Sequence, residues 1–223
     1  MSPFDPSKAG AGASAEAAHG PTAVERVADT IRAEILSGEL PSDAPLREEA
    51  AAARYGVSRH TVRAAFQRLV AERLVVAMPY RGVRVASFDR DTIIALQQLR
   101  AALEVEAVRI AGERYGREWP DAVLEPVRHA IERLAASADW LEAERVHADY
   151  HRALVAASGS PRIIEAHAAL GSELLLFLLH VQPHYTLESL VVEHRELLDA
   201  VQAEGPEAVR RHLEHSTRLL VGE

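Results

Sequence analysis

The stretch YGVSRHTVRAAFQRL, residues 55–69, constrains the fold of this chain more than any other part. Gly56 and Val57 separate two short segments of helical period, and glycine takes the positive φ of such a turn without steric cost. Ser58 is suited to capping the second segment, whose apolar side chains recur every three to four residues. Two short helices joined by a tight glycine turn predict a helix-turn-helix.

The sequence around this stretch completes a small domain. A helical period begins at Thr22 and stops at Gly38, and the loop ELPSDAP leads to a short helix at 46–55. After the helix at 58–72, two short apolar runs surround PYRG, which is typical of a β-hairpin. The pattern predicts a winged helix-turn-helix domain over residues 21–87.

From Asp89 onward the sequence has a helical period and no strand signal. Glycine and proline residues divide it into six predicted helices. The six cover residues 89–115, 120–137, 139–157, 160–181, 186–204 and 206–221. The chain is therefore predicted to be mainly α, with an all-helical antiparallel bundle at residues 88–223 after the winged domain.

The distribution of charge separates these two parts. Residues 57–86 hold six arginines and one glutamate, whereas residues 89–223 have a net charge of −9. A small basic patch on an acidic body indicates a local contact with nucleic acid. The chain has no cysteine, so disulfides and thiolate metal sites are excluded.

No apolar run is long enough to span a bilayer, and the N-terminus lacks the pattern of a secretory signal. We therefore expect a cytoplasmic protein with no membrane partner. Residues 1–20 are small and polar without periodicity, which predicts a disordered tail.

The second helix of the helix-turn-helix carries, at its N-terminal end, side chains of the kind that a recognition helix presents to base edges. The fork of Arg59 or Arg63 matches two acceptors of guanine, and an exposed helix terminus suits a phosphate. Arg68 and Arg73 fit a solvated helix face instead, and His60 fits either a contact or a spectator. The predicted DNA contacts here and at the wing tip are Ser58, Arg59, His60, Thr61, Arg63 and Arg81.

The N-terminal part resembles the DNA-binding domain of the GntR-type bacterial transcription regulators. ILSGEL, L-R-E, YGVSR, VR and RGVRV follow one another at that family's spacing over nearly all of residues 22–86. The resemblance implies DNA contacts at Arg47, Arg59, Arg63 and Gly82. The chain departs from the family at Ser42-Asp43, His60-Thr61 and Glu72-Arg73. The family often has Pro-Gly, Thr-Pro or Gly-Thr, and Glu-Gly there, and none of the three changes removes a core position.

Two of the eleven histidines, His147 and His151, lie four residues apart on one predicted helix. This spacing projects both rings from one face, which is a common way of placing two imidazoles on one metal ion. His194 and His212 lie on two later predicted helices. Taken singly, each histidine is more simply explained as a hydrogen-bonded residue beside an apolar core, and spacing alone does not show that three helices converge.

Residues 93–221 resemble the all-helical FCD effector domain of one large GntR subgroup, in its smaller six-helix subclass. The similarity rests on LRAALEVEAVRIA, HADYHRALVAASGSPRI, EHRELLDAV and AVRRHLEHS. The resemblance implies that a divalent metal is bound in an effector pocket by His147, His151, His194 and His212. The family has an aspartate where this chain has His147. A neutral ligand in place of an anionic one favours Zn²⁺ or Ni²⁺, and also an anionic effector.

Arg100 lies in LQQLRAALE, where the family has an arginine that points into the cavity. Its guanidinium would bind a carboxylate effector through two parallel hydrogen bonds, or form an ion pair with Glu104 one turn further on. We therefore expect a ligand-responsive transcription regulator that is not an enzyme, in the family's usual role of repressor. As a homodimer it would bind a palindromic DNA operator with half-sites about one helical turn apart.

Two other functions are alternatives. A metal-dependent hydrolase with a DNA-binding appendage would need a catalytic carboxylate or base beside an open metal position, and the chain has no HExxH or comparable motif. In a structural dimeric DNA-binding protein, the bundle would only dimerise and would bind no effector.

Overall fold

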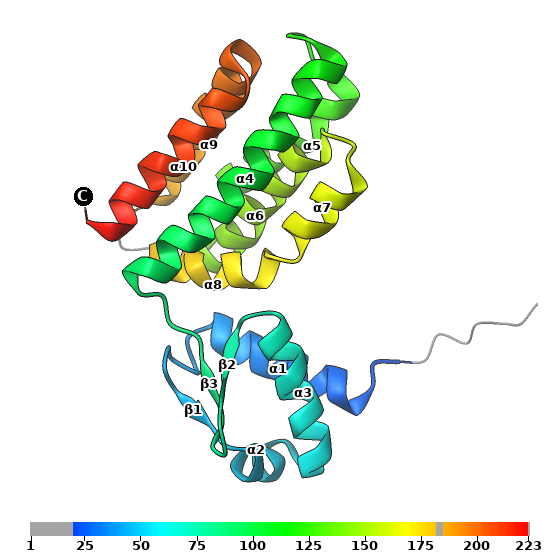
Figure 1. Ribbon diagram of the computed structural model, residues 1–223, viewed down its shortest axis with the longest axis vertical. Coiled ribbons are helices and arrows are strands. Elements are labelled where there is room, and N and C mark those ends of the chain that lie inside the picture. Colours follow the sequence, from blue (N-terminus) through cyan, green and yellow to red (C-terminus); the bar gives the residue numbers. More distant parts are fainter. Residues whose placement is uncertain (1–19, 182–184, 223) are drawn as a thin grey trace, which may run out of the picture.

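The computed structural model describes residues 20–181 and 185–222 of the chain. The predicted tail at residues 1–20 falls outside the described residues, apart from Gly20. Within the described residues the chain forms ten helices and one three-stranded sheet. A small domain with the sheet lies below a larger helical bundle (Figure 1). This agrees with the mainly α architecture that the sequence predicts.

Three helices form the framework of the small domain, namely α1 (Ala23–Leu36), α2 (Glu48–Tyr55) and α3 (Arg59–Ala71). Thr22 and Ser58 cap α1 and α3, each through a side-chain oxygen that accepts a backbone N–H. These caps satisfy donors that a helix start leaves without partners, so they fix where both helices begin.

The turn between α2 and α3 is the one that the glycine predicts. Gly56 ends α2 with φ +65°, in the left-handed region. Val57 follows it and packs, partly buried, against the core of the domain. The apolar face of α3 contributes four buried residues to that core, which are Val62, Ala65, Phe66 and Leu69. The predicted helix-turn-helix is therefore confirmed.

The sheet has the strand order β1-β3-β2 and is antiparallel throughout. Its strands are β1 (Pro45–Leu46), β2 (Val75–Met78) and β3 (Gly82–Val85). The hairpin of β2 and β3 is the predicted wing. The sequence pattern does not predict β1, because a two-residue edge strand that contains a proline has no alternation to detect. As a consequence α2 begins at Glu48 and is shorter than the predicted helix.

The described part of the bundle contains seven helices rather than the six that the punctuation predicts. They are α4 (Arg90–Tyr115), α5 (Asp121–Ala135), α6 (Trp140–Ala156), α7 (Pro161–Ala168), α8 (Gly171–Val181), α9 (Leu187–Glu204) and α10 (Pro206–Val221). The predicted helix at 160–181 divides at Ala169 and Leu170 into α7 and α8. The count of six, on which the likeness to the smaller subclass rested, is therefore corrected. No described helix has both the length and the apolar character to cross a membrane.

The division of the predicted helix lets α8 turn across the end of the bundle, where it faces the small domain (Figure 1). Leu176 of α8 is 2% exposed and belongs to the core of the small domain. Leu174 and Phe177 instead pack into a cluster of the bundle. This break is a tertiary feature, since only Gly171 marks it in the sequence.

An ion pair also joins the two domains. Arg73 follows the end of α3 with φ +57°, and its Nε lies 3.6 Å from a carboxylate oxygen of Glu173 on α8. Its side chain is 68% exposed, as the sequence suggests, but it lies after the end of α3 rather than on a helix face. Asp43 likewise has φ +65°. Both residues stand at positions where the family that the sequence resembles often has glycine. Both keep a left-handed backbone, which glycine adopts more easily.

Glu144 is an acidic side chain in the interior of the bundle, on α6. It is 1% exposed, and neither carboxylate oxygen has a hydrogen-bond partner among the described residues. Burial raises the pKa of Glu144 from 4.5 to about 8, so the folded protein keeps this carboxyl protonated at neutral pH. The unfolded chain loses that proton above its ordinary pKa. The free energy of unfolding therefore falls as the pH rises between these two values.

The variant Glu144→Gln should remove this loss of stability. At pH 7 we expect its free energy of unfolding to exceed that of the wild type by at most about 3 kcal/mol. This difference should disappear at about pH 4. Urea unfolding followed by circular dichroism over this pH range measures both. Glu125→Gln is the matched control, because Glu125 is exposed on α5. Equal stabilities of Glu144→Gln and the wild type at pH 7 would contradict the prediction.

Candidate functional site

A groove of about 770 Å³ opens between α2, α3 and the wing. The N-terminal end of α3 lies beside α2, at the end of the molecule away from the bundle (Figure 1). Four of the predicted DNA contacts line the groove as cations, and they are Arg47, Arg59, Arg63 and Arg81. The fold therefore gathers arginines from three separate segments of the chain onto one face.

The remaining predicted contacts lie around this groove. Ser58 and His60 are exposed at the start of α3, and Thr61 is partly buried. The Ser58 hydroxyl already accepts the backbone N–H of Thr61 at 3.1 Å. Gly82 lies at the groove with φ +90°, and a Cβ there would be 2.3 Å from the backbone oxygen of Leu46. Glycine is thus required at position 82 by the close approach of β1, whatever the wing contacts.

The cations of the groove differ in their surroundings. Arg63 forms a bidentate ion pair with Glu48, whereas the other three arginines of the groove have no carboxylate partner in the described chain. Arg68 points elsewhere, is about half exposed and pairs with Glu25 of α1. Among the described residues of the groove, one arginine is therefore held in place by a carboxylate, and three form no ion pair.

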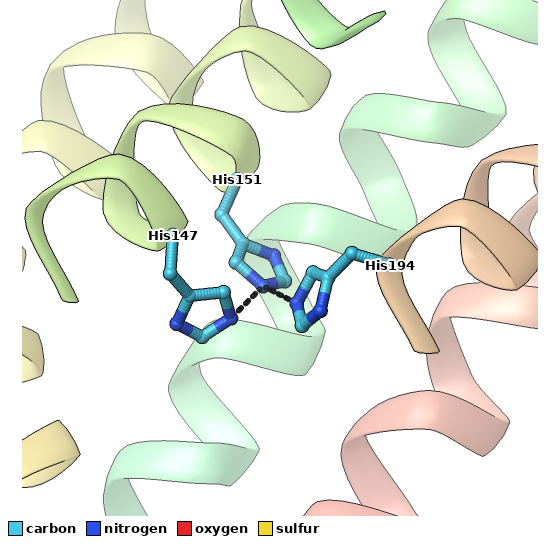
Figure 2. A group of neighbouring side chains, drawn as sticks. All are labelled: His147, His151 and His194. Atoms are coloured by element: carbon cyan, nitrogen blue, oxygen red, sulfur yellow. Dashed lines mark hydrogen bonds between the residues drawn. The ribbon is translucent and has the colours of Figure 1, made fainter. Parts of the chain in front are cut away.

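A second feature lies inside the bundle, where three imidazole rings meet (Figure 2). The Nε2 atom of His151 is 3.0 Å from Nε2 of His147 and 3.3 Å from Nε2 of His194. All three side chains are buried, and their facing nitrogens lie within 4.8 Å of one another. Helix α6 supplies the first two rings and α9 supplies the third. The tertiary structure thus brings together three of the four histidines that the sequence singles out.

The fourth, His212 on α10, is close to the other three but less central. Its ring centroid lies 5.1 Å from that of His194 and 5.8 Å from that of His151. Its nitrogens are not in the set that lies within 4.8 Å. Asp149 faces away from this cluster and pairs with Arg133, as its position on the helix predicts.

Hydrogen bonds on the outer side of two rings fix which nitrogen carries the proton. Nδ1 of His151 lies 2.9 Å from a carboxylate oxygen of Glu104, and Nδ1 of His194 lies 2.7 Å from the backbone oxygen of Leu190. Both partners accept, so both Nδ1 atoms donate, and each Nε2 carries a lone pair. The contact of 3.3 Å between these two Nε2 atoms is therefore not a hydrogen bond. The lone pair on Nε2 of His151 can accept a hydrogen bond from Nε2 of His147, 3.0 Å away, and it also faces the lone pair of His194.

The environment keeps the rings neutral. Burial, followed by the neighbouring imidazoles, lowers the pKa of His147 and His194 well below the usual range. Burial likewise lowers the pKa of His151, and lowers that of His212 to about 3. Neutral imidazoles are the form that binds a metal ion, so all four rings are available as ligands at neutral pH.

Glu104 is a residue of this cluster that sequence reasoning does not identify beyond its possible pairing with Arg100. It is fully buried and accepts hydrogen bonds from Arg100, His151 and His167. Burial would raise the pKa of Glu104, but Arg100 and His151 outweigh this effect and hold the pKa well below its usual range. The carboxylate is therefore ionised in the interior. The only signal in the sequence is the spacing of Arg100 and Glu104, one turn apart.

Arg100 realises the ion pair that was one of its two predicted roles. Its Nε lies 3.1 Å from Glu104, and Nη1 lies 3.0 Å from Oε1 of Gln97. The side chain also lines two small cavities of about 10 Å³ each, beside His147 and Phe177. Arg100 thus contacts both the buried carboxylate and the space next to the imidazoles.

A winged helix-turn-helix with an arginine-lined groove, joined to an all-helical domain, defines a class of DNA-binding transcription regulators. Comparison with family models gives the finer assignment. The chain belongs to the GntR family, in the group with an FCD domain. The model of bacterial regulatory proteins of the gntR family matches residues 23–85, and the FCD domain model matches residues 95–218. The regulators of this family are not enzymes, which excludes the hydrolase alternative.

Individual proteins agree with this assignment. The chain is 31% identical over 197 residues to a probable D-xylose utilization operon transcriptional repressor of Paenarthrobacter nicotinovorans, covering 87% of this chain and 85% of that one. It is 32% identical over 139 residues to the HTH-type transcriptional repressor GlaR of Escherichia coli, covering 60% and 63%. A crystal structure of a GntR regulator from Rhodococcus sp. RHA1 superposes with a TM-score of 0.72 at 28% identity, covering 89% and 97%.

Arg63→Ala should weaken binding to an operator duplex by about tenfold or more, because Arg63 lies in the groove on the predicted recognition helix. The operator is first selected by the wild-type protein from a random-sequence pool, and affinities are then measured by fluorescence anisotropy. Arg68→Ala is the matched control on the same helix, since Arg68 lies outside the groove. Operator affinity that is the same in Arg63→Ala and the wild type would refute a base contact.

Nitrogen-15 NMR of the metal-free protein measures which ring nitrogen of His151 and of His194 carries the proton. We expect both rings to be protonated on Nδ1. In Glu104→Gln the amide oxygen should face Arg100 and His167, so that the NH2 group faces His151 and moves its proton to Nε2. The tautomer of His194, which donates to a backbone oxygen, should stay the same. If the variant does not fold, the wild-type spectrum still decides, because protonation of His151 on Nε2 would contradict the assignment.

Proposed function

We propose that this regulator is a homodimeric, ligand-responsive repressor whose bundle binds a divalent metal ion and a small carboxylate effector. The observation that carries the proposal is the meeting of three uncharged imidazole rings in the bundle interior. Nε2 of His151 lies 3.0 Å from Nε2 of His147 and 3.3 Å from Nε2 of His194. Four nitrogens placed tetrahedrally around Zn²⁺, at about 2.0–2.1 Å, would be about 3.3 Å from one another. The two Nε2–Nε2 distances at His151 are close to this value.

The electrostatics of the cluster support the same conclusion. The lone pairs of His151 and His194 face each other, which is unfavourable unless a cation lies between them. His147, His151 and His194 would bind the ion, and His212 would complete the set by a small movement of its ring. Four neutral imidazole ligands suit Zn²⁺ or Ni²⁺ better than Mg²⁺. When bound, the metal would supply a Lewis acid able to bind a carboxylate oxygen.

Glu104 supports this use of the rings. A metal-binding histidine usually donates its other N–H to a carboxylate or a carbonyl, which orients the ring. His151 and His194 have these two kinds of partner at 2.9 and 2.7 Å. The buried negative charge of Glu104 also compensates for the aspartate ligand that His147 replaces.

The effector site would lie beside the rings, where Arg100 lines the cavities. Each cavity has about 10 Å³, which is room for roughly one water molecule. A carboxylate larger than the smallest anions would therefore have to displace part of the wall. Leu174 and Phe177 form that wall, and both come from α8.

Displacement of α8 would reach the DNA-binding domain, because Leu176 lies in that domain's core. The effector would then favour one placement of the two heads of a dimer, and it would release DNA only if it binds the DNA-incompetent placement more tightly. Two relatives are named as repressors, which favours repression here. Arg47, Arg59, Arg63 and Arg81 would contact each half-site of a palindromic operator, together with Ser58, His60, Thr61 and Gly82.

Native mass spectrometry with elemental analysis of freshly purified protein tests this proposal. We expect a dimer with one metal ion per chain, and His151→Ala should weaken metal binding by at least about tenfold. His129→Ala is the matched control, because His129 is exposed on α5. A dimer without metal that shows no thermal shift with any carboxylate would support the alternative in which the bundle only dimerises. A monomer in the native mass spectrum would contradict the proposed homodimer.

A further inference from the structure

A carboxylate lies within the arginine-lined groove. Glu48 is the first residue of α2, and its two oxygens accept hydrogen bonds from Nε of Arg63 at 2.8 Å and from Nη2 at 2.7 Å. The Glu48 side chain is 21% exposed, whereas that of Arg63 is 58% exposed. The ion pair therefore occupies one edge of the guanidinium and leaves the rest open to the groove.

A negative charge at this place is unexpected on electrostatic grounds alone. DNA binding depends on attraction between cations and phosphates, so a carboxylate in the groove should weaken the binding of any DNA sequence. Glu49 lies next to Glu48 and lines the same groove, but it is exposed and has no ion pair in the described chain. The two acidic residues thus differ in their exposure and in the contact with Arg63.

That contact limits how Arg63 can meet a base. A free arginine has many rotamers, and their loss on binding reduces affinity. With Nε and one N–H of Nη2 bonded to Glu48, the Nη1–Nη2 end of the fork remains as a pair of parallel donors. Two such donors match the O6 and N7 acceptors of guanine in the major groove. Arg59, on the same helix, forms no ion pair with a carboxylate among the described residues, although its charge, after that of Arg63, also lowers the pKa of Glu48.

We propose that Glu48 is a specificity-determining residue that positions Arg63 for one base pair of the operator. The inference rests on the DNA contact proposed above for Arg63. Glu48 acts through Arg63 and opposes DNA binding by its own charge. It therefore strengthens operator binding relative to the binding of unrelated DNA, rather than DNA binding as a whole.

The test is the affinity of Glu48→Gln for two duplexes of equal length, namely the operator selected by the wild-type protein and an unrelated sequence. We expect binding to the operator to weaken by about tenfold. Binding to the unrelated duplex should stay the same or become tighter, because the variant removes a negative charge. If Glu48 acted through its charge alone, Glu48→Gln would bind the operator more tightly than the wild type.

Glu49→Gln is the matched control, since it removes the same charge from the same turn of α2 without a contact to Arg63. It should bind both duplexes equally well or more tightly than the wild type. Combining Glu48→Gln with Arg63→Ala provides a second check. The weakening of operator binding by Glu48→Gln should disappear in the Arg63→Ala background, where removal of the negative charge should leave operator binding unchanged or make it tighter.

Several results would overturn the inference. The first is that Glu48→Gln binds the operator as tightly as the wild type or more tightly. The second is that Glu48→Gln still weakens operator binding when Arg63 is alanine. If Arg63→Ala alone leaves operator binding unchanged, the proposed base contact fails instead, and the inference fails with it. If Arg63→Ala weakens binding while Glu48→Gln does not, only the role of Glu48 is wrong.

Discussion

The interior of the bundle depends on the saturated hydrogen bonding of one buried carboxylate. Glu104 joins three helices, because Arg100 comes from its own helix α4, His151 from α6 and His167 from α7. An ionised carboxyl in this interior is tolerable only when its partners are well placed, and removing one partner of such a pair typically costs about 3–5 kcal/mol. The same bonds fix the orientation of His151. The stability of the bundle and the geometry of its imidazole cluster therefore depend on the same atoms.

Helix α8 connects this interior to the DNA-binding domain. Adjacent residues of α8 belong to different environments, since Leu176 packs into the core of the small domain and Phe177 lines a cavity beside the imidazoles. The Phe177 ring also contacts that of Phe88, in the segment between the wing and α4, at a centroid distance of 5.9 Å. A close-packed interior transmits small displacements, so an event beside the rings has a direct physical route to the wing domain.

The two parts of the chain use charge in opposite ways. The groove presents arginines to solvent, where their attraction for phosphate is long-ranged and weakened by salt. The imidazole cluster is buried, and burial lowers the pKa of its rings and keeps them uncharged. One chain thus combines a screened, cationic surface with a neutral set of ligands in its interior. The net charge of −8 conceals this division, because the acidic residues lie mainly outside the groove.

Local sequence determined the features that depend on local chemistry. The positive φ of Gly56, the cap by Ser58 and the spacing of His147 and His151 are all set by neighbours within a turn or two. Only the tertiary structure decided the rest. The break that separates α7 from α8, the strand β1, and the meeting of Glu104 with the rings of α6 and α7 result from packing between segments far apart in the chain. Such contacts leave no periodic pattern in the sequence, because burial in a folded core decides them and local propensity does not.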